Sequence, residues 1–374
     1  MIKILFVTDH AYPPHRVGGA EASTHDLALT LQEKGVEVTV LAALPSGRVR
    51  NLPSDVLRRA LGREAFRTDR DMGYPVFRAR DPARAAGQAL TRFVPSAVVV
   101  TAGSYAELAE AFLRWNLPTI LYMRDVETAS IGRELPSRDR VTYVSNSRFN
   151  ASRVATVTGV APIVIPPLVR PERVRTETTR SRVLFVNPVP QKGVDVAFQL
   201  AEARPDIPFD FVECWHLEGP AREGLLARAR VLPNVTVHPS TDDPRRLYAN
   251  ARIVLVPSRW EESWARVVTE AHYCGIPVLA SDRGGLPESV GPGGILVEHD
   301  ALPARWCEAL SRMWDDHATY AALVEAAQRY AMRPEIQPGV LVDRFIAFVT
   351  EHVARCRGPR SPMLDVAVAD PLDT

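Results

Sequence analysis

Residues 260–285, WEESWARVVTEAHYCGIPVLASDRGG, place two acidic residues, Glu262 and Glu270, around an apolar run. Ser263 is expected to cap a helix, and Gly275 to end it in the left-handed conformation. In a helix, the eight-residue spacing would separate the two carboxylates by about 12 Å along nearly one face. Carboxylates at this spacing suit a ligand longer than one sugar ring, and each can accept hydrogen bonds from two adjacent hydroxyls.

The segment from Glu262 to Glu270 lies between two expected strands. Ile253–Val256 precedes it and Val278–Ala280 follows it, so Glu262 would follow the carboxyl end of a strand. Beyond the second strand, Gly284 and Gly285 can expose backbone N–H groups toward an anion. A strand, a loop and a helix in this order are typical of a parallel α/β sheet, which binds ligands at the carboxyl ends of its strands.

The same strand–helix order recurs in two halves of the 374-residue chain, which is too long for one ordinary core. Arg170–Arg182 is polar and separates the halves as a linker does. We therefore predict an α/β fold with two Rossmann-like, doubly wound parallel sheets that face each other across a cleft. Residues 1–167 would form the first domain and 168–339 the second, and 358–374 would be a disordered tail.

The continuous apolar run Ile2–Val7 predicts a strand that is buried on both faces, and further short segments rich in apolar residues predict the other strands. In the first half the predicted strands are Ile2–Val7, Val36–Leu41, Tyr74–Arg80, Ala97–Thr101, Thr119–Met123 and Val141–Val144. In the second half they are Val183–Val186, Phe209–Val212, Val235–His238, Ile253–Val256 and Val278–Ala280.

Composition narrows the class of protein. The net charge of +1 gives no overall reason to expect nucleic-acid binding, and no apolar run reaches the roughly 18 residues that suggest a membrane span. The first residues, MIKILFVTDH, resemble a strand and not a signal peptide. The four cysteines lie far apart without zinc-type spacing, which predicts reduced thiols and a cytoplasmic protein. Only three of the 45 Lys and Arg residues are lysine, which draws attention to Lys192 in a loop.

Together these motifs resemble the signature of the retaining glycosyltransferases of family 4, also called glycosyl transferases group 1, which have the GT-B fold. That signature joins a Glu-x7-Glu motif to a following GG-x-PE, and 257–288 (PSRWEESWARVVTEAHYCGIPVLASDRGGLPE) contains both. The resemblance extends to the family's first loop at 9–21 (DHAYPPHRVGGAE), to 145–149 (SNSRF), to the hinge at 164–167 (VIPP), and to the second-domain phosphate loop at 191–195 (QKGVD). It also implies a last helix, over about 340–356, that crosses back onto the first domain.

The resemblance implies a role for each matching residue. Glu270 would bind the ribose hydroxyls of a donor nucleotide, and Glu262 the transferred sugar. Lys192 would contact the diphosphate, where a fixed cation favours departure of the leaving group, so Lys192 and Glu262 are the candidate catalytic residues. Gly18 and Gly19 would let the backbone approach the diphosphate at the start of a helix. The remaining candidates for donor binding are Ser263, Trp264 and Arg266.

Two positions depart from the family pattern. The family usually has an Arg four residues before the phosphate-loop lysine, where this chain has Pro188. The alternative sources of that cation are Arg16, Arg266 and Arg283. The family often has a His at the end of a first-domain strand, where this chain has Arg124. Arg124 could hold an anionic acceptor, contact the sugar, or pair with Asp125.

The first loop carries polar side chains with two interpretations each. Glu21 could contact an acceptor, although an acidic residue in a first helical turn also interacts favourably with the helix dipole. His10 and His15 could face the cleft or be exposed loop residues.

Asp69-Arg70-Asp71 spells the metal motif of the other main glycosyltransferase fold. It is expected in a polar loop without a preceding apolar strand, so we predict no metal and no other cofactor. Residues 48–70 are rich in Arg, and 54–66 could form an amphipathic helix. That helix could touch a membrane surface, frame the acceptor or pack on its own domain.

The resemblance predicts a metal-independent enzyme that moves a hexose-like sugar from an NDP-sugar to an acceptor hydroxyl with retention, by front-face attack. The expected partners are that donor and a small-molecule, glycan or lipid-linked acceptor, with no nucleic acid, and the protein would be a monomer or homodimer. An NDP-sugar epimerase and a non-catalytic sugar-nucleotide binding protein of the same fold stay open. A dinucleotide oxidoreductase is disfavoured because the first loop lacks GxGxxG.

Overall fold

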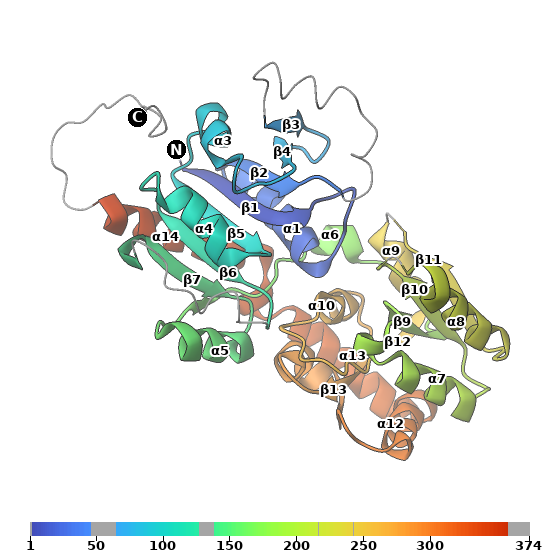
Figure 1. Ribbon diagram of the computed structural model, residues 1–374. Coiled ribbons are helices and arrows are strands. Elements are labelled where there is room, and N and C mark those ends of the chain that lie inside the picture. The colour runs from blue at the N-terminus through green and yellow to red at the C-terminus, as the bar shows by residue number, and fades with distance from the viewer. Residues whose placement is uncertain (1, 46–64, 127–137, 216, 242, 358–374) are drawn as a thin grey trace.

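The computed structural model describes residues 2–45, 65–126, 138–215, 217–241 and 243–357. Within these ranges the chain forms two lobes, each built on one β-sheet with helices on both faces (Figure 1). Among the helices in these ranges, none has the length and apolar character to traverse a lipid bilayer. The tail expected at 358–374 and nearly all of the helix expected at 54–66 lie outside the described residues.

The first sheet has the strand order β3-β4-β2-β1-β5-β6-β7-β8, and its pairs are parallel except β3 with β4. Central strand β1 is buried on both faces, which explains its continuous apolar run. The strands are β1 (Lys3–Ala11), β2 (Glu37–Ala43), β3 (Phe66–Asp69), β4 (Val76–Ala79), β5 (Ala97–Ala102), β6 (Thr119–Met123), β7 (Val141–Ser145) and β8 (Ile163–Val164). The helices are α1 (Gly19–Glu33), α3 (Ala86–Arg92), α4 (Tyr105–Leu113) and α5 (Arg148–Thr158).

The second sheet is wholly parallel, in the order β11-β10-β9-β12-β13-β14. Counted from β9, this is the doubly wound order 3-2-1-4-5-6. The strands are β9 (Arg182–Val186), β10 (Phe209–Glu213), β11 (Val235–Pro239), β12 (Ala251–Val256), β13 (Val278–Asp282) and β14 (Gly294–Glu298). The helices are α7 (Val194–Ala203), α8 (Gly219–Arg230), α9 (Pro244–Tyr248), α10 (Arg266–Tyr273), α11 (Leu286–Val290), α12 (Pro303–Asp315) and α13 (His317–Ala331).

The antiparallel edge strand β3 was not predicted, because Phe66 is the one large apolar residue within it. Phe66 stacks on Phe77 of β4, with 4.4 Å between ring centroids, and Arg78 of β4 donates a hydrogen bond to Asp69. The first carboxylate of the Asp-Arg-Asp motif therefore ends an edge strand and is bound by an arginine, whereas the sequence predicts a polar loop.

The chain crosses between the lobes twice. The first crossing contains α6 (Pro171–Val174), whose buried Val174 packs with Trp264 of the second lobe, so this segment is more ordered than a polar linker. The second crossing is α14 (Pro338–Arg357), the helix expected over 340–356. This helix lies along the first lobe (Figure 1). Phe345 and Val349 are among its side chains that pack in the core of that lobe.

His272 on α10 gives the fold a predicted sensitivity to acid. Its side chain is buried, and neither ring nitrogen has a hydrogen-bond partner. Burial, and secondly the charge of Arg333, lower the pKa of His272 to about 3. The unfolded chain binds this proton near pH 6.5, so the stabilising contribution is complete above that pH and is lost as the pH falls toward 3.

We therefore expect the free energy of unfolding to fall by about 1.4 kcal/mol per pH unit for this group between about pH 6.5 and pH 3. Buried His25 adds to the effect down to about pH 4, where burial places its pKa. Denaturant unfolding from pH 7 to pH 4 measures this slope. His272→Leu should reduce the slope by the contribution of one proton, about 1.4 kcal/mol per pH unit. The same slope in the variant would assign the titration to another group.

Candidate active site

A cavity of about 540 Å³ lies between the two lobes. It is bordered by residues at the carboxyl ends of β1, β5 and β6 in the first lobe and of β9, β10 and β12 in the second. The strand order reverses between β1 and β5 and between β9 and β12, so the cavity occupies the usual ligand position of both sheets. Its polar and aromatic lining includes His10, Ser104, Arg124, Asp125, Asn146, Asn187, Lys192, Trp215, Ser258, Trp260, Glu262, Ser263 and Arg266.

Lys192 and Glu262 meet on the second-lobe side of this cavity. The lysine Nζ lies 2.5 Å from Glu262 Oε1, which also accepts a hydrogen bond from the Ser258 hydroxyl at 2.7 Å. Gly193 allows the phosphate loop to approach: it has φ of 78°, and a Cβ there would lie 1.9 Å from the carbonyl oxygen of Pro257. The close backbone contact therefore sets a largely buried lysine–carboxylate pair at the cavity wall.

Two indoles flank Lys192, and neither contact was predicted from the sequence. The lysine Nζ lies 4.9 Å from the ring centroid of Trp215 and 5.3 Å from that of Trp260. Both tryptophans border the cavity, and Trp260 is 40% exposed. Cation–π attraction holds the ammonium between the rings and leaves an aromatic surface for a ligand. They belong to separate loops, so no local pattern predicts their meeting.

The helix after Glu262 begins later than predicted. α10 starts at Arg266, and Ala265 before it has φ of 67°, a left-handed conformation that non-glycine residues seldom adopt. Glu262 therefore lies in a loop, and the helical spacing predicted between Glu262 and Glu270 is wrong. Both carboxylates are nevertheless buried, at 7% and 8% exposed, so neither is an ordinary solvated side chain.

Ser263 joins the two lobes and does not cap α10. Its hydroxyl donates to the backbone carbonyl of Arg124 at 2.5 Å and accepts from the Asn146 side-chain amide at 2.7 Å. The prediction of a helix cap is wrong because the hydroxyl is engaged by the first lobe. Through this contact, the loop that carries Glu262 is tied to the carboxyl ends of β6 and β7.

Gly284 and Gly285 support the Glu262 loop from behind. A Cβ at Gly284 would lie 2.5 Å from the Glu262 carbonyl oxygen, and one at Gly285 would lie 2.3 Å from that of Ser263. The Gly285 N–H donates to the Glu262 carbonyl at 2.7 Å. The sequence suggested that this N–H is exposed toward an anion, but the Glu262 carbonyl occupies it. The two glycines instead permit close packing of backbone against backbone.

Glu270 and Arg266 form an ion pair one helical turn apart. Arg266 Nε donates to Glu270 Oε1 at 2.5 Å, and the Tyr248 hydroxyl donates to Oε2 at 2.6 Å. The other arginine nitrogens donate to the carbonyl of Leu168 at 2.8 Å and to the carboxylate of Asp26. Arg266 borders the cavity, but the protein engages all three of its nitrogens; Glu270 lies behind it and does not border the cavity itself.

Trp264 also borders the cavity, and its indole packs with residues of the second lobe and of the two crossing segments. The side chain is buried with Val174 and Tyr273, and its ring N–H donates to the Thr269 hydroxyl at 3.0 Å. The ring N–H is thus engaged by the protein, and a contact between the ring and a donor stays a prediction. The aromatic surface at the cavity belongs to Trp260 and Trp215.

The start of α1 forms the opposite wall. Gly18 is the residue before the helix and Gly19 is its first residue, with Gly19 bordering the cavity. A Cβ at Gly18 would lie 2.4 Å from a carboxylate oxygen of Glu21. Glycine at position 18 therefore makes room for the Glu21 carboxylate, and Gly19 places the helix N-terminus, with its partial positive charge, at the cavity.

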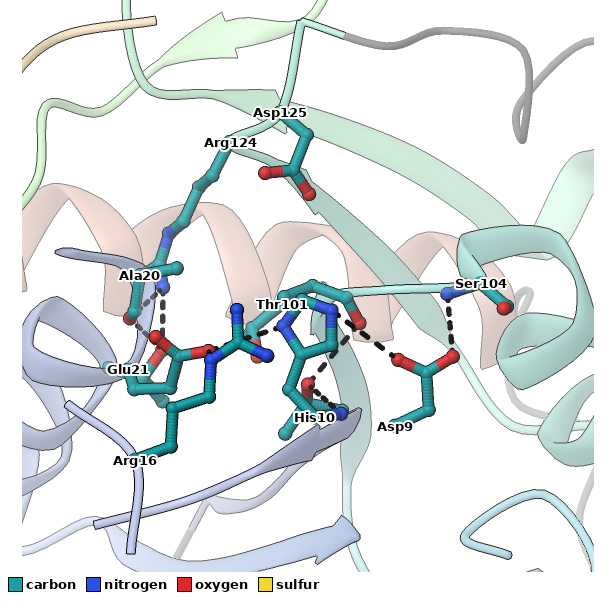
Figure 2. A network of polar contacts seen from close by, with 12 residues as sticks. Asp9, His10, Arg16, Ala20, Glu21, Thr101, Ser104, Arg124 and Asp125 are labelled. Carbon is teal, nitrogen blue, oxygen red and sulfur yellow. Dashed lines mark hydrogen bonds and ion pairs between the residues drawn. The ribbon is translucent and has the colours of Figure 1, made fainter. Parts of the chain in front are cut away.

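A polar network covers this wall (Figure 2). His10 Nδ1 lies 3.2 Å from Glu21 Oε1, and Arg16 Nε lies 3.5 Å from the same oxygen. Burial by itself would raise the pKa of Glu21, but the His10 hydrogen bond and the Arg16 charge bring it below its usual value. His10 borders the cavity whereas His15 is exposed, so His10 is the histidine of the first loop that faces the cleft.

Arg124 makes its hydrogen bonds to α1 and not to Asp125 (Figure 2). Its Nη1 donates to the Ala20 carbonyl at 2.8 Å and to the Thr24 hydroxyl at 2.5 Å, and its guanidinium lies 3.9 Å from the Tyr122 ring centroid. The residue is 5% exposed and borders the cavity, while Nε and Nη2 have no hydrogen-bond partner.

Three arginines, Arg16, Arg266 and Arg283, were the candidates to replace the cation that Pro188 does not supply. Pro188 is buried. Arg16 and Arg283 do not border the cavity, and Arg266 does but is fully engaged. Among the arginines of the described ranges that border the cavity, Arg124 is the one that keeps unpartnered donors.

Solved structures share this two-lobed architecture. The crystal structure of Anabaena HepE in complex with UDP-glucose matches with a TM-score of 0.72 at 17% identity, covering 94% of this chain and 100% of that chain. Sucrose-phosphate synthase from Thermosynechococcus elongatus matches with a TM-score of 0.72 at 16% identity, covering 94% and 99%. The fold is therefore GT-B, the two-domain fold of nucleotide-sugar glycosyltransferases.

Sequence comparisons narrow the class further. The family model of the glycosyl transferases group 1 matches residues 180–316, which contain Lys192, Glu262 and Glu270. The D-inositol 3-phosphate glycosyltransferase of Salinispora tropica is 38% identical over 144 residues, 37% of this chain. That match spans only 28% of the relative's own length. The second lobe of this chain is thus similar in sequence to the group 1 glycosyltransferases.

Proposed function

We propose that this protein is a retaining glycosyltransferase of family 4 that moves a sugar from an NDP-sugar donor to an acceptor hydroxyl. The observation that carries the proposal is the Lys192–Glu262 pair, 2.5 Å apart at the wall of the interlobe cavity and within the matched group 1 domain. The likeness in fold to HepE, whose structure contains UDP-glucose, supports a nucleotide-sugar as the donor.

Each wall of the cavity supplies part of the chemistry. Negative charge builds up on the leaving diphosphate in the transition state, and Lys192, together with the N-terminus of α1, would stabilise it. When the diphosphate engages Lys192, Glu262 Oε1 would keep its bond from Ser258 and could accept a second one from a hydroxyl of the transferred sugar. Glu270 would accept from the ribose hydroxyls, which requires the donor to reach past Arg266.

Front-face attack is the mechanism we propose for retention. The leaving diphosphate would help to deprotonate the acceptor hydroxyl, which approaches from the first lobe beside His10 and Glu21. Arg124 would contact the sugar or an anionic acceptor. With Lys192 and the α1 amides opposite the phosphates, the reaction would need no metal ion, so activity should survive EDTA.

A second candidate is a non-catalytic sugar-nucleotide binding protein. Pro188 in place of the family's arginine, and the engagement of Arg266 by protein groups, favour it because they leave Lys192 as the cation of the phosphate loop.

The free state of all four cysteines supports a cytoplasmic location for either candidate. A monomer or homodimer would suit both.

A thermal-shift panel of UDP-, GDP-, TDP- and ADP-glucose in EDTA tests the donor site. A ligand that binds only the folded state stabilises it by about 2.7 kcal/mol at 100 times its Kd, so we expect one nucleotide class to raise the melting temperature. Release of nucleoside diphosphate in the presence of polyol and glycan acceptors then separates transferase from binding protein. If no sugar nucleotide shifts the transition, the proposed donor site is wrong.

A further inference from the structure

A chain of charged groups connects the two lobes behind the cavity. Asp26 lies on α1 of the first lobe, and Arg266 and Glu270 lie on α10 of the second. Arg266 Nη2 donates to Asp26 Oδ2, and its Nε donates to Glu270 Oε1 at 2.5 Å. One guanidinium therefore binds a carboxylate from each lobe.

The two carboxylates in this series of charged groups each have one further partner. Arg173 of α6 donates to Asp26 Oδ1 at 2.6 Å, and Tyr248 donates to Glu270 Oε2 at 2.6 Å. Asp26 is 0% exposed. Two arginines and two carboxylates thus balance in charge, as a buried ionic group must for its desolvation to be offset.

We propose that Asp26 is a positioning residue for donor binding: from the first lobe it holds Arg266, and through Arg266 it sets the orientation and charge of Glu270. The inference rests on the proposed function, in which Glu270 accepts the ribose hydroxyls. Because Asp26 and Glu270 lie on different lobes, the arrangement exists only while the lobes are together as in this structure.

Asp26 influences Glu270 because the two carboxylates compete for Arg266. With Asp26 in place, the guanidinium divides its charge between two carboxylates, and Glu270 keeps acceptor strength for neutral hydroxyls. Without the Asp26 charge, Arg266 has Glu270 as its sole anionic partner and binds it more tightly. The ribose hydroxyls must then displace a stronger ion pair, so the ribonucleotide loses its advantage over a deoxynucleotide.

The test measures ribose preference, which is the ratio of the Kd of 2′-deoxy-UDP to that of UDP, by titration calorimetry on the full chain. Should the donor panel select another base, its nucleoside diphosphate pair is used. We expect a preference of about tenfold or more for the wild type, since hydrogen bonds to charged groups are the stronger class. Glu270→Gln should reduce it, and Asp26→Asn should reduce it to within about twofold of parity.

Glu288→Gln is the matched control. Glu288 is also an interlobe carboxylate, accepting from the Arg148 N–H at 2.8 Å, but none of its hydrogen bonds or ion pairs involves Arg266 or Glu270. Its ribose preference should equal that of the wild type. Asp26→Glu, which keeps the charge, should retain most of the preference, and Asp26→Ser repeats the test if the Asn variant folds poorly.

The outcomes separate the two proposals. If Glu270→Gln loses the preference while both Asp26→Asn and Asp26→Ser keep it, Asp26 is not a positioning residue and the donor site stands. If Glu288→Gln loses it as fully as Asp26→Asn, general contact between the lobes is responsible and the inference is overturned. A wild type without ribose preference would remove the role assigned to Glu270, and the inference with it.

Discussion

Lys192→Ala should lower kcat by about 10²–10³-fold, the range measured when a fixed group that stabilises transition-state charge is removed. Lys192 is the cation of the phosphate loop, and Pro188 supplies no second one. The effect should fall mainly on kcat, because the charge on the leaving diphosphate is largest in the transition state. Initial rates of nucleoside diphosphate release over a range of donor concentrations measure it.

Lys34→Ala is the control for the loss of one lysine. Lys34 is exposed on the first lobe and pairs with Asp343 on α14, so its removal should leave kcat unchanged. Thermal unfolding of both variants shows whether the fold is retained. If Lys192→Ala kept kcat within about threefold of wild type, well below the range expected for such a group, the cation at the diphosphate would have to come from elsewhere, and Arg124 would be the next residue to replace.

Glu270→Ala should abolish the thermal shift caused by the donor nucleotide. Two ribose hydroxyls that donate to one carboxylate contribute about 1.5–3 kcal/mol each, so the Kd should rise by at least about 100-fold. The variant should also be less stable in the absence of ligand, because it leaves the largely buried Arg266 and the buried Tyr248 without this partner. Nucleotide titrations monitored by thermal shift and calorimetry report both effects.

Two variants separate binding from folding at this position. Glu270→Gln keeps the shape and one acceptor oxygen but removes the charge, so it should fold more stably than Glu270→Ala and still bind nucleotide weakly. Glu325→Ala removes an exposed helical carboxylate that pairs with Arg329 and should leave the donor shift intact. A normal donor shift in Glu270→Ala would mean that the ribose lies elsewhere.

Much of the fold could be predicted because local patterns determine it. Continuous apolar runs such as that of β1 identify strands buried on both faces, and the expected strands of both sheets are present with boundaries shifted by a few residues. Edge strand β3 lacked this pattern, since an edge needs less apolar surface. The start of α10 was misplaced because contacts with the first lobe and with Gly285 decide the backbone there.

The residues of the candidate site could be predicted only where they belong to a family sequence motif. Lys192 and Glu262 lie 70 positions apart in sequence, yet the family resemblance implied both. Trp215 and Asp26 belong to no motif, and each meets its partner through tertiary contacts. Asp26 and Arg266 are 240 positions apart, so no pattern within one element could reveal that bond.

The return of α14 to the first lobe has a consequence for synthesis on the ribosome. Phe345, Val349 and further apolar residues of α14 complete a core whose remaining members come from residues before 170. The second lobe, by contrast, draws its two main cores from a continuous stretch between residues 183 and 324. We therefore expect the lobe that is translated second to reach its native core first, while the nascent first lobe keeps an apolar face uncovered until residues 338–357 leave the exit tunnel.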